Sequence, residues 1–348
     1  TEADLAAHPE AFVRTEGGIV ANGRDPYFPP WPDVVQLNAF SGDLRGAVSR
    51  VLIDIGDQCD GVRCDMAMLM TNQVFARTWG DRGGPAPAAD YWPTVIGQVK
   101  TVHPDLVFIA EAYWDMEWTL QQQGFDLCYD KRLYDRLVHD PAEAVRGHLQ
   151  ADPGYQAGLI RFIENHDEPR AAATFDPARE RAAAVVMSTL EGARLYHDGQ
   201  LEGARTHIPV FLGRGPDEPS DPGLRSFYSR LLEAVSESGL RQGDWQLCDC
   251  SGWPDNDSYR RLVAWCWASS EGRQLVAVNL SDAPAQGHVQ LPWPDLEDHS
   301  WCLRDRLREL SFVRDGDELR RDGLYVGLDG WGAHFLELSA LTTEGSLP

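Results

Sequence analysis

The sequence predicts a parallel α/β sheet followed by a separate antiparallel β domain. Between residues 61 and 200, short apolar runs alternate with helical patterns, which is the rhythm of βα units. Acidic residues stand at the ends of three of these runs, namely Asp65, Glu111 and Asp167. From about Gln242, β-branched and aromatic runs broken by turn residues replace the helical patterns, which favours antiparallel strands.

The first elements are a loop and a helix. Residues 1–40 mix Pro, Gly, aromatic and charged residues with no sustained period, and NGRDPYFPPWPD is typical of an ordered loop dense in turn residues. Residues 41–58 then carry apolar side chains near helical spacing, with Ser41 or Asp43 as the N-cap. We therefore expect an irregular start and a first helix from Ser41.

The strands of the parallel sheet come next. Their candidates are GVRC, LVFIA, FDLCY, LIRFI and ARLY, with predicted helices between them. Glu111 and Asp167 are 56 residues apart (167 minus 111), which leaves room for two βα units with FDLCYD as the strand between. The carboxyl ends of parallel strands share the rim of a (β/α)8 barrel or the crevice of an open sheet. Either arrangement brings the three acids near one another.

Composition excludes several classes of partner. The 348 residues hold 54 acidic and 31 basic side chains, a formal charge of -23, which repels nucleic acid and anionic membrane surfaces. No apolar run approaches the roughly 18 residues of a transmembrane helix, and the first residues carry no basic and apolar leader pattern. The seven cysteines form no CxxC pair and indicate reduced core residues. We expect a cytoplasmic protein without metal or cofactor.

Paired carboxylates indicate glycosidic-bond chemistry. Cleavage with retention needs one ionised carboxylate as nucleophile and one carboxylic acid as proton donor, about 5 to 5.5 Å apart. Arg63, two residues before Asp65 on the same strand, is expected to keep Asp65 ionised. Glu111 lies between LVFIA and Ala-Tyr-Trp, an apolar setting that favours the protonated acid. An Arg-x-Asp pair by itself is more often a plain salt bridge.

The third acid lies in a polar segment. In ENHDEPR, Asn165, His166 and Asp167 offer donors and an acceptor suited to adjacent sugar hydroxyls. Trp114, close to Glu111, is a candidate platform for stacking of a sugar ring. His197 and Asp198 follow the last predicted strand, and we interpret them as strand-end residues.

These segments resemble a known family. GVRCDMA, IAEAYW and FIENHDEPR look like three strand-end motifs of the α-amylase family, glycoside hydrolase family 13, in the family's order. The resemblance extends through GARLYHDGQLEG and the terminal β domain, so it covers nearly the whole chain. It implies that Asp65 is the nucleophile, Glu111 the general acid/base and Asp167 the transition-state stabiliser. Arg63 and His166 would bind the sugar in the -1 subsite.

The resemblance also implies a domain plan. Residues 1–40 would be the remnant of a loop or inserted domain, 41–241 the strands four to eight of an incomplete (β/α)8 TIM barrel, and 242–348 a C-terminal β-sandwich domain. The family's Asp-x-x-x-Asn-His motif is absent, so an N-terminal third is expected to be missing. Met68 and Leu69 replace the Lys-His pair that contacts the +1 sugar in many α-amylases, and no calcium segment is recognisable.

The sequence is compatible with three functions. The first is a retaining α-glycosidase or α-transglucosidase acting on α-glucans such as starch, glycogen or maltooligosaccharides. The second is a metal-dependent barrel hydrolase with Asp65, Glu111, His166 and Asp167 as ligands, which Arg63 disfavours because its charge repels a cation. The third is a glucan-binding protein or inactive fragment without catalysis.

Overall fold

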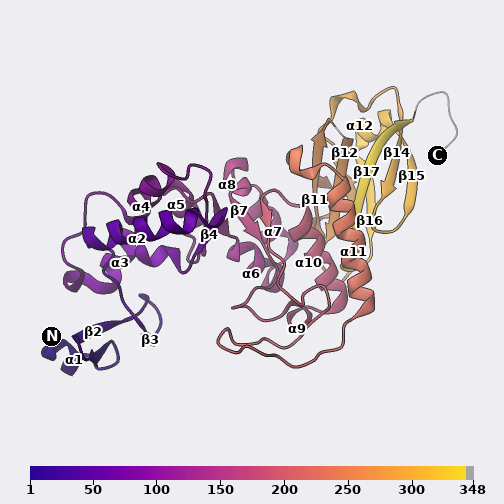
Figure 1. The fold of residues 1–348 in the computed structure, drawn as a ribbon. Coiled ribbons are helices and arrows are strands. Elements are labelled where there is room, and N and C mark those ends of the chain that lie inside the picture. Colours follow the sequence, from indigo (N-terminus) through magenta and orange to yellow (C-terminus); the bar gives the residue numbers. More distant parts are fainter. Residues whose placement is uncertain (271, 342–348) are drawn as a thin grey trace. The chain divides into compact units, whose positions relative to one another are not determined.

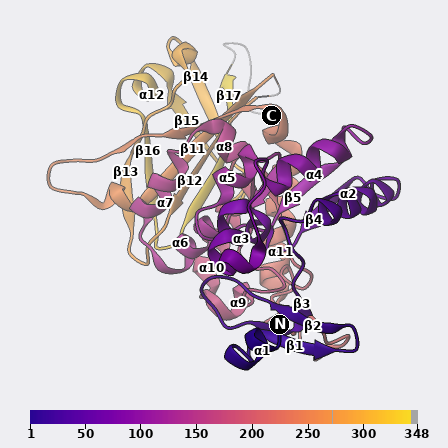
Figure 2. The same ribbon diagram turned by 90° about the vertical axis from the view of Figure 1, so that its left-hand side faces the viewer.

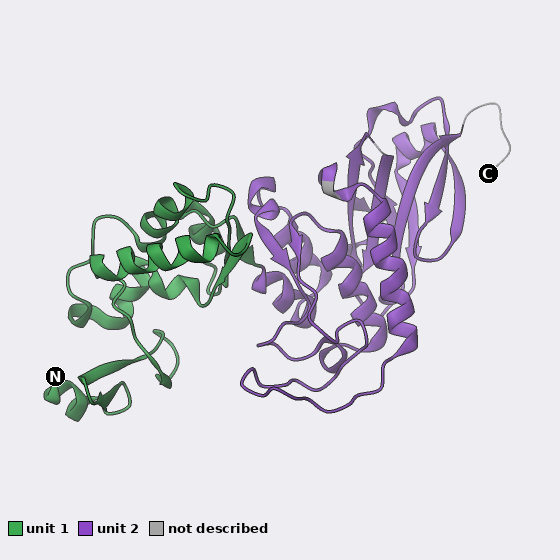
Figure 3. Cartoon of the chain, viewed as in Figure 1, with its two compact units in different colours: residues 1–129 green, residues 130–348 purple. Residues whose placement is uncertain are grey.

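The computed structural model describes residues 1–270 and 272–341. The chain divides into two compact units, Thr1–Tyr129 and Asp130–Pro348 (Figures 1 and 3). No helix among the described residues is long and apolar enough to cross a membrane.

The first unit begins with a small antiparallel sheet. Helix α1 (Glu2–Ala7) precedes β1 (Phe12–Thr15), β2 (Gly18–Gly23) and β3 (Trp31–Val35), which pair in the order β1-β2-β3. The expectation that residues 1–40 form only a loop therefore needs correction, although 24–30 do form the expected irregular connection. These strands are short and mostly exposed, so they lack the apolar pattern that marks a strand in sequence.

Parallel βα units follow in the first unit. Their elements are α2 (Gly42–Gly56), β4 (Gly61–Cys64), α3 (Asn72–Trp79), α4 (Tyr91–Lys100), β5 (Val107–Ala110), α5 (Glu117–Gln122) and β6 (Leu127–Tyr129). Strand β5 pairs in parallel with both β4 and β6, which confirms the predicted strand type. Ser41 caps α2 by accepting a hydrogen bond from the backbone N–H of Leu44, as the sequence predicts.

The second unit continues the βα pattern. Its first elements are α6 (Lys131–His139), α7 (Ala142–Leu149), α8 (Pro153–Ala157), β7 (Leu159–Arg161), α9 (Ala171–Thr174), α10 (Pro177–Thr189), β8 (Ala193–Arg194) and α11 (Pro222–Glu237). Strands β7 and β8 pair in parallel. Asp176 and Asp221 cap α10 and α11, and each is followed by the proline that suits the first helical position.

The antiparallel strands predicted from residue 242 are present in the second unit. Its strands are β9 (Asp244–Cys248), β10 (Cys250–Ser251), β11 (Leu262–Ser269), β12 (Gly272–Asn279), β13 (Ala285–Val289), β14 (Ser300–Asp305), β15 (Leu310–Asp315), β16 (Leu324–Leu328) and β17 (Ala333–Leu341), with α12 (Gly316–Asp322) between β15 and β16. One sheet has the order β15-β14-β17-β12-β11-β9, and a smaller sheet has the order β10-β13-β16. Strands β13 and β16 run side by side (Figure 2). Residues 342–348 of the predicted domain lie outside the described residues.

Strands β11 and β12 are buried on both faces. Alternate residues of these strands, such as Val263 and Trp265, join a core with helices α10 and α11, whereas Leu262 and Ala264 join the core shared with β13 and β16. The indole N–H groups of Trp265 and Trp267 both donate to the carbonyl of Thr189 at the end of α10, at 3.1 and 2.8 Å. These two bonds satisfy a helix-end carbonyl and attach α10 to the sheet.

Candidate active site

Two of the predicted acids lie at the ends of adjacent parallel strands. Asp65 directly follows β4 and Glu111 directly follows β5, and the register of the pair places Cys64 opposite Ala110. The ladder continues past the strands, since the backbone N–H of Glu111 donates to the carbonyl of Cys64 at 3.1 Å. Both side chains therefore leave the same edge of the sheet, as the parallel arrangement predicts.

Arg63 connects these two acids. Its guanidinium forms an ion pair with Asp65 and another with Glu111, where Nη2 lies 2.9 Å from Oε1. It also lies over the ring of Tyr129, which ends β6, with 5.6 Å to the ring centroid. Burial disfavours the Arg63 cation, but the Glu111 charge and the hydrogen bonds of Asp65 and Tyr129 outweigh it, so the pKa of Arg63 is raised. Arg63 is thus a fixed positive charge between the carboxylates.

The two acids differ sharply in exposure. The Asp65 side chain is 78% exposed, whereas Glu111 is 3% exposed. Glu111 nevertheless has polar partners, because its Oε2 accepts the backbone N–H of Met66 at 2.6 Å and its Oε1 accepts the Tyr113 hydroxyl at 3.3 Å. Its surroundings are therefore buried but less apolar than the sequence predicts. The expected difference in pKa between the two acids stays a prediction.

Backbone strain accompanies both acids. Met66 follows Asp65 with φ 41°, and Trp114 and Asp115 follow Glu111 with φ 61° and 60°. Residues other than glycine rarely adopt such values, and they persist only where surrounding contacts hold them. For Met66 the contact is the bond from its N–H to Glu111. The half-buried ring of Trp114 packs edge-on against Tyr27, with 4.9 Å between ring centroids.

The remaining predicted residues lie in the second unit, in the turn after β7. The Asn165 side-chain carbonyl accepts the backbone N–H groups of Asp167 and Glu168, both at 2.9 Å, and Asn165 is 1% exposed. These two hydrogen bonds stabilise the turn. His166 and Asp167 are 41% and 43% exposed, with Nε2 and Oδ2 3.0 Å apart. The turn thus presents His166 and Asp167 but keeps the amide of Asn165 inside.

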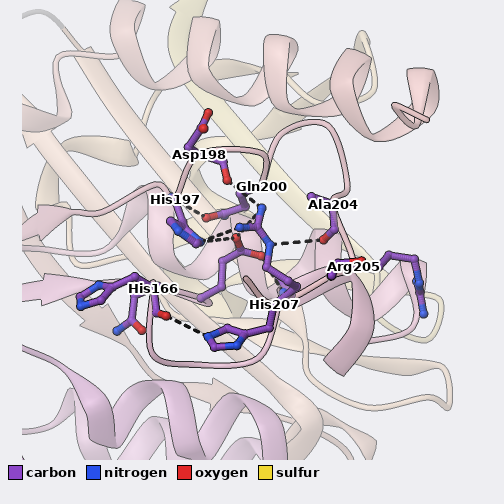
Figure 4. A network of polar contacts seen from close by, with 12 residues as sticks. His166, His197, Asp198, Gln200, Ala204, Arg205 and His207 are labelled. Carbon is purple, nitrogen blue, oxygen red and sulfur yellow. Dashed lines mark hydrogen bonds and ion pairs between the residues drawn. The ribbon is translucent and has the colours of Figure 1, made fainter. Parts of the chain in front are cut away.

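A buried network supports this turn (Figure 4). Arg170, 5% exposed, lies 3.1 Å from a carboxylate oxygen of Glu164 and donates to Nδ1 of His197 at 2.8 Å. It also donates to the backbone carbonyls of Asp198 at 2.8 Å and Ala204 at 3.4 Å. One arginine therefore joins the segment after β7 to the segment after β8.

Burial shifts the pKa values within this network. Burial raises the pKa of Glu164 to about 7, although the backbone N–H of Ala171 and the charge of Arg170 act in the opposite direction. Burial and then the Arg170 charge lower the pKa of His197. A neutral His197 can accept the Arg170 hydrogen bond at Nδ1, an atom that also lies 3.1 Å from Oε1 of Glu164.

The segment after β8 also reaches the turn directly. The Nε2 atom of His207 lies 2.8 Å from the carbonyl oxygen of His166 (Figure 4). Gly199 has φ +85°, and a Cβ atom there would lie 2.7 Å from Nη2 of Arg170. Gln200 donates to the Tyr228 hydroxyl of α11 at 2.9 Å, which anchors the same segment.

The structure thus brings together Arg63, Asp65 and Glu111 in one unit, and Asn165, His166 and Asp167 in the other. Sequence reasoning missed Tyr129, Glu164 and Arg170. Tyr129 ends a predicted strand, and Glu164 and Arg170 flank the Asn-His-Asp segment. Their place in the sequence next to these features was the only sign that they belong to the site. Met68, one of the two residues that the resemblance aligns with a Lys-His pair, is fully buried. Among the described residues, no group of three or more His, Cys, Asp or Glu side chains is placed to hold a metal ion.

Two curated proteins are similar in sequence. An α-amylase, MalA of Haloarcula japonica, is 24% identical over 265 residues, which are 73% of this chain and 36% of that protein. An α-1,4-glucan:maltose-1-phosphate maltosyltransferase of Picrophilus torridus is 22% identical over 219 residues, 59% of this chain and 34% of that protein. The chain spans about a third of the length of these curated relatives. No protein-family model matches it.

Solved structures share the fold. A maltogenic α-amylase, AmyB of Thermotoga neapolitana, superimposes with a TM-score of 0.69 at 19% identity, covering 98% of this chain and 74% of that one. The α-amylase of Geobacillus thermoleovorans complexed with acarbose gives a TM-score of 0.64 at 18% identity, covering 97% and 74%. The neighbours are α-amylase-family proteins, which confirms at the level of the fold the resemblance carried by the strand-end motifs.

Proposed function

Because the chain has the fold of the α-amylases, we propose that it carries the catalytic residues of a retaining α-glycosidase or α-transglucosidase acting on α-glucans. The observation that carries this proposal is the contact of Arg63 with both Asp65 and Glu111. One guanidinium in contact with two carboxylates favours the short separation that retention requires over the wider spacing of inverting enzymes. The similar α-amylase and maltosyltransferase support a substrate of the α-glucan class.

The proposed reaction is a double displacement. Asp65 attacks the anomeric carbon while Glu111 gives a proton to the leaving glycosidic oxygen, which forms a covalent glycosyl-enzyme. Glu111 then takes a proton from water or from an acceptor sugar, whose oxygen displaces Asp65 with net retention. Asp167 stabilises the positive charge of the transition state, and Arg63 and His166 bind the sugar at the reacting centre.

The contacts of the two acids support this division of roles. Asp65 is mostly exposed and paired with Arg63, so its carboxylate is accessible for attack. Glu111 is buried and receives the backbone N–H of Met66 on one oxygen, which fixes its orientation. Asn165 acts by shaping the turn that presents His166 and Asp167. Trp114 is proposed as a ring that a bound sugar contacts.

We further propose that β4 to β8 are strands four to eight of a (β/α)8 barrel. Five successive strands, each followed by a helix or a long loop, support this order. The three-part division into 1–40, 41–241 and 242–348 is part of the same proposal. Met68 is buried rather than presented to a sugar, which supports a specificity different from that of α-amylases with a Lys-His pair.

The test compares Asp65→Asn and Glu111→Gln on maltooligosaccharides and on a maltosyl fluoride. Both variants are expected to lose at least roughly 10⁴-fold in kcat on maltooligosaccharides. On the fluoride, whose leaving group needs no proton, Glu111→Gln should still release fluoride while Asp65→Asn should not. The matched control is Asp54→Asn, an exposed aspartate on α2, which should retain the activity of the parent.

Near-parent turnover by Asp65→Asn would show that another group is the nucleophile. Equal fluoride release by the two variants would contradict the separate roles. Turnover that requires an added divalent cation and is abolished by chelators would favour a metal-dependent hydrolase instead.

A further inference from the structure

The outer face of the small β10-β13-β16 sheet is aromatic and polar. Along β16, Leu324, Val326 and Leu328 point inward and are buried, whereas Tyr325 points outward and is 48% exposed. On β13 the outward residues are Gln286 and His288, which the register places opposite Gly327 and Tyr325.

Three rings gather on this face. Trp253, 39% exposed, lies 5.1 Å from the ring of His288 and 6.2 Å from the ring of Tyr325, centroid to centroid. The rings of His288 and Tyr325 are 6.1 Å apart. Contiguous exposed apolar surface often marks a ligand-binding or interaction site. We call Trp253, Gln286, His288 and Tyr325 the β13–β16 face.

A pocket of about 480 Å³ adjoins the aromatic rings, within the size range of ligand sites. Its wall includes the polar side chains of Asn256, Ser258, Gln286, Arg308, Tyr325 and Asp329. Tyr325 belongs to both the rings and the pocket, and its hydroxyl lies 2.9 Å from Oε1 of Gln286. A Cβ atom at Gly327 would lie 3.0 Å from the Tyr325 hydroxyl, so the absence of a side chain at Gly327 leaves space for the Tyr325 ring.

The chemistry of this surface selects a neutral, polyhydroxylated ligand. The pocket lining carries one positive and one negative side chain, Arg308 and Asp329, so it has no net charge to attract an ion. The formal charge of -23 disfavours polyanions. Flat apolar rings beside amide and hydroxyl groups match the two sides of a sugar, whose ring faces carry C–H groups and whose edges carry hydroxyls.

We infer that the β13–β16 face is a second glucan-binding surface, built from residues other than those of the proposed catalytic site. The choice of an α-glucan as ligand rests on the proposed function, whereas the neutral sugar class rests on the face itself. Such a surface would hold one part of a glucan polymer on the protein while another part of the same polymer reacts. This raises the effective concentration of substrate.

The test measures binding without turnover. The full chain with Asp65→Asn is run in native gels that contain soluble starch, and the dissociation constant is obtained from its retardation relative to gels without starch. Adding Trp253→Ala and Tyr325→Ala is expected to weaken binding roughly tenfold or more, about the loss of one or two aromatic contacts. Gln286→Arg, which places a long charged side chain in the pocket without removing a ring, should weaken it as well.

The matched control is Val313→Ala, which removes a half-exposed apolar side chain from β15 of the other sheet and should leave the dissociation constant unchanged. Retardation that is absent in the parent, or unaffected by both the double alanine variant and Gln286→Arg, would overturn the inference. Fluoride release by the wild-type chain, measured separately, decides the proposed function. Retardation without any fluoride release would therefore leave this surface standing while the proposed function failed.

Discussion

Arg63 and Arg170 both contact carboxylates after parallel strands, but they use those contacts differently. Arg63 is 26% exposed and links a buried glutamate to an aspartate that faces solvent. Arg170 is 5% exposed and contacts a buried glutamate, a histidine and two backbone carbonyls. The first arginine contacts the two carboxylates proposed to react, and the second supports the turn that carries His166 and Asp167.

The two arginines are therefore expected to act in different ways, Arg63 through its charge and Arg170 through the structure of the segments that it joins. Removal of Arg63 changes the charge next to both proposed reacting carboxylates, whereas removal of Arg170 changes the shape of the two segments that it joins. A charge close to reacting groups is expected to alter rate more than stability. A buried charge that satisfies backbone carbonyls and a carboxylate is expected to alter stability first.

The largest expected effect is that of Arg170→Met on stability. It removes the cation beside the buried Glu164 and leaves the carbonyls of Asp198 and Ala204 without that donor, which should cost about 3–5 kcal/mol of unfolding free energy. Arg63→Met should cost only about 1–2 kcal/mol, because Glu111 keeps the N–H of Met66 and Asp65 is in water. Urea unfolding followed by tryptophan fluorescence measures both.

The double variant Arg170→Met with Glu164→Gln serves as the control for the buried charge. It should recover part of the loss, since a neutral amide needs no neighbouring cation. An equal loss of unfolding free energy in Arg63→Met and Arg170→Met would contradict this difference and would mean that both arginines have the same structural role.

The sequence predicted Arg63, Asp65 and Glu111 as one group because the relation among them is local. Arg63 and Asp65 are two residues apart, and the ends of two adjacent parallel strands bring Glu111 beside them. The parallel strand type was predictable for the same reason, from alternating apolar runs and helices. The residue roles within this group stay predictions until activity is measured.

Arg170, Glu164 and the first sheet could not be predicted in this way. Arg170 acts through contacts with residues 27 to 34 positions further along the chain, and nothing in its local sequence marks those partners. Strands β1 and β3 are mostly exposed, so they show no buried face. The prediction of β11 succeeded because helices cover one of its faces and a sheet covers the other, which leaves a continuous apolar run.

A second prediction contrasts Glu164 with another buried acid of the same unit. Burial raises the pKa of Glu180 on α10 to about 7, and its Oε1 has no hydrogen-bond partner within the described part of the chain. Because the folded state holds the proton more tightly than the unfolded state, whose ordinary value is 4.5, stability should fall as pH rises from about 4.5 to about 7. Glu180→Gln should remove the part of that slope that comes from Glu180, leaving the part that comes from Glu164, and should stabilise the protein at pH 8 by roughly 1–3 kcal/mol.

Urea unfolding at pH 5 and pH 8 measures this effect, with Glu233→Gln on the exposed face of α11 as the matched control. The control should leave the slope as in the parent. If Glu180→Gln raises the unfolding free energy as much at pH 5 as at pH 8, the gain comes from packing rather than from removal of the buried charge.

The smallest expected effect tests how closely Arg170 fits the segment after β8. Gly199 has φ +85°, which costs a residue with a side chain about 1–2 kcal/mol, and its new Cβ atom would press on Nη2 of Arg170 at 2.7 Å. Gly199→Ala should therefore lower the unfolding free energy by roughly 1–2 kcal/mol through the backbone, with a smaller steric cost from the contact with Arg170 added to it. In the Arg170→Met background the steric part of this cost disappears while the backbone part remains, so the two changes should be less than additive. Full additivity in urea unfolding would mean that the cost lies in the backbone of Gly199 alone and that Arg170 does not shape this segment through that contact.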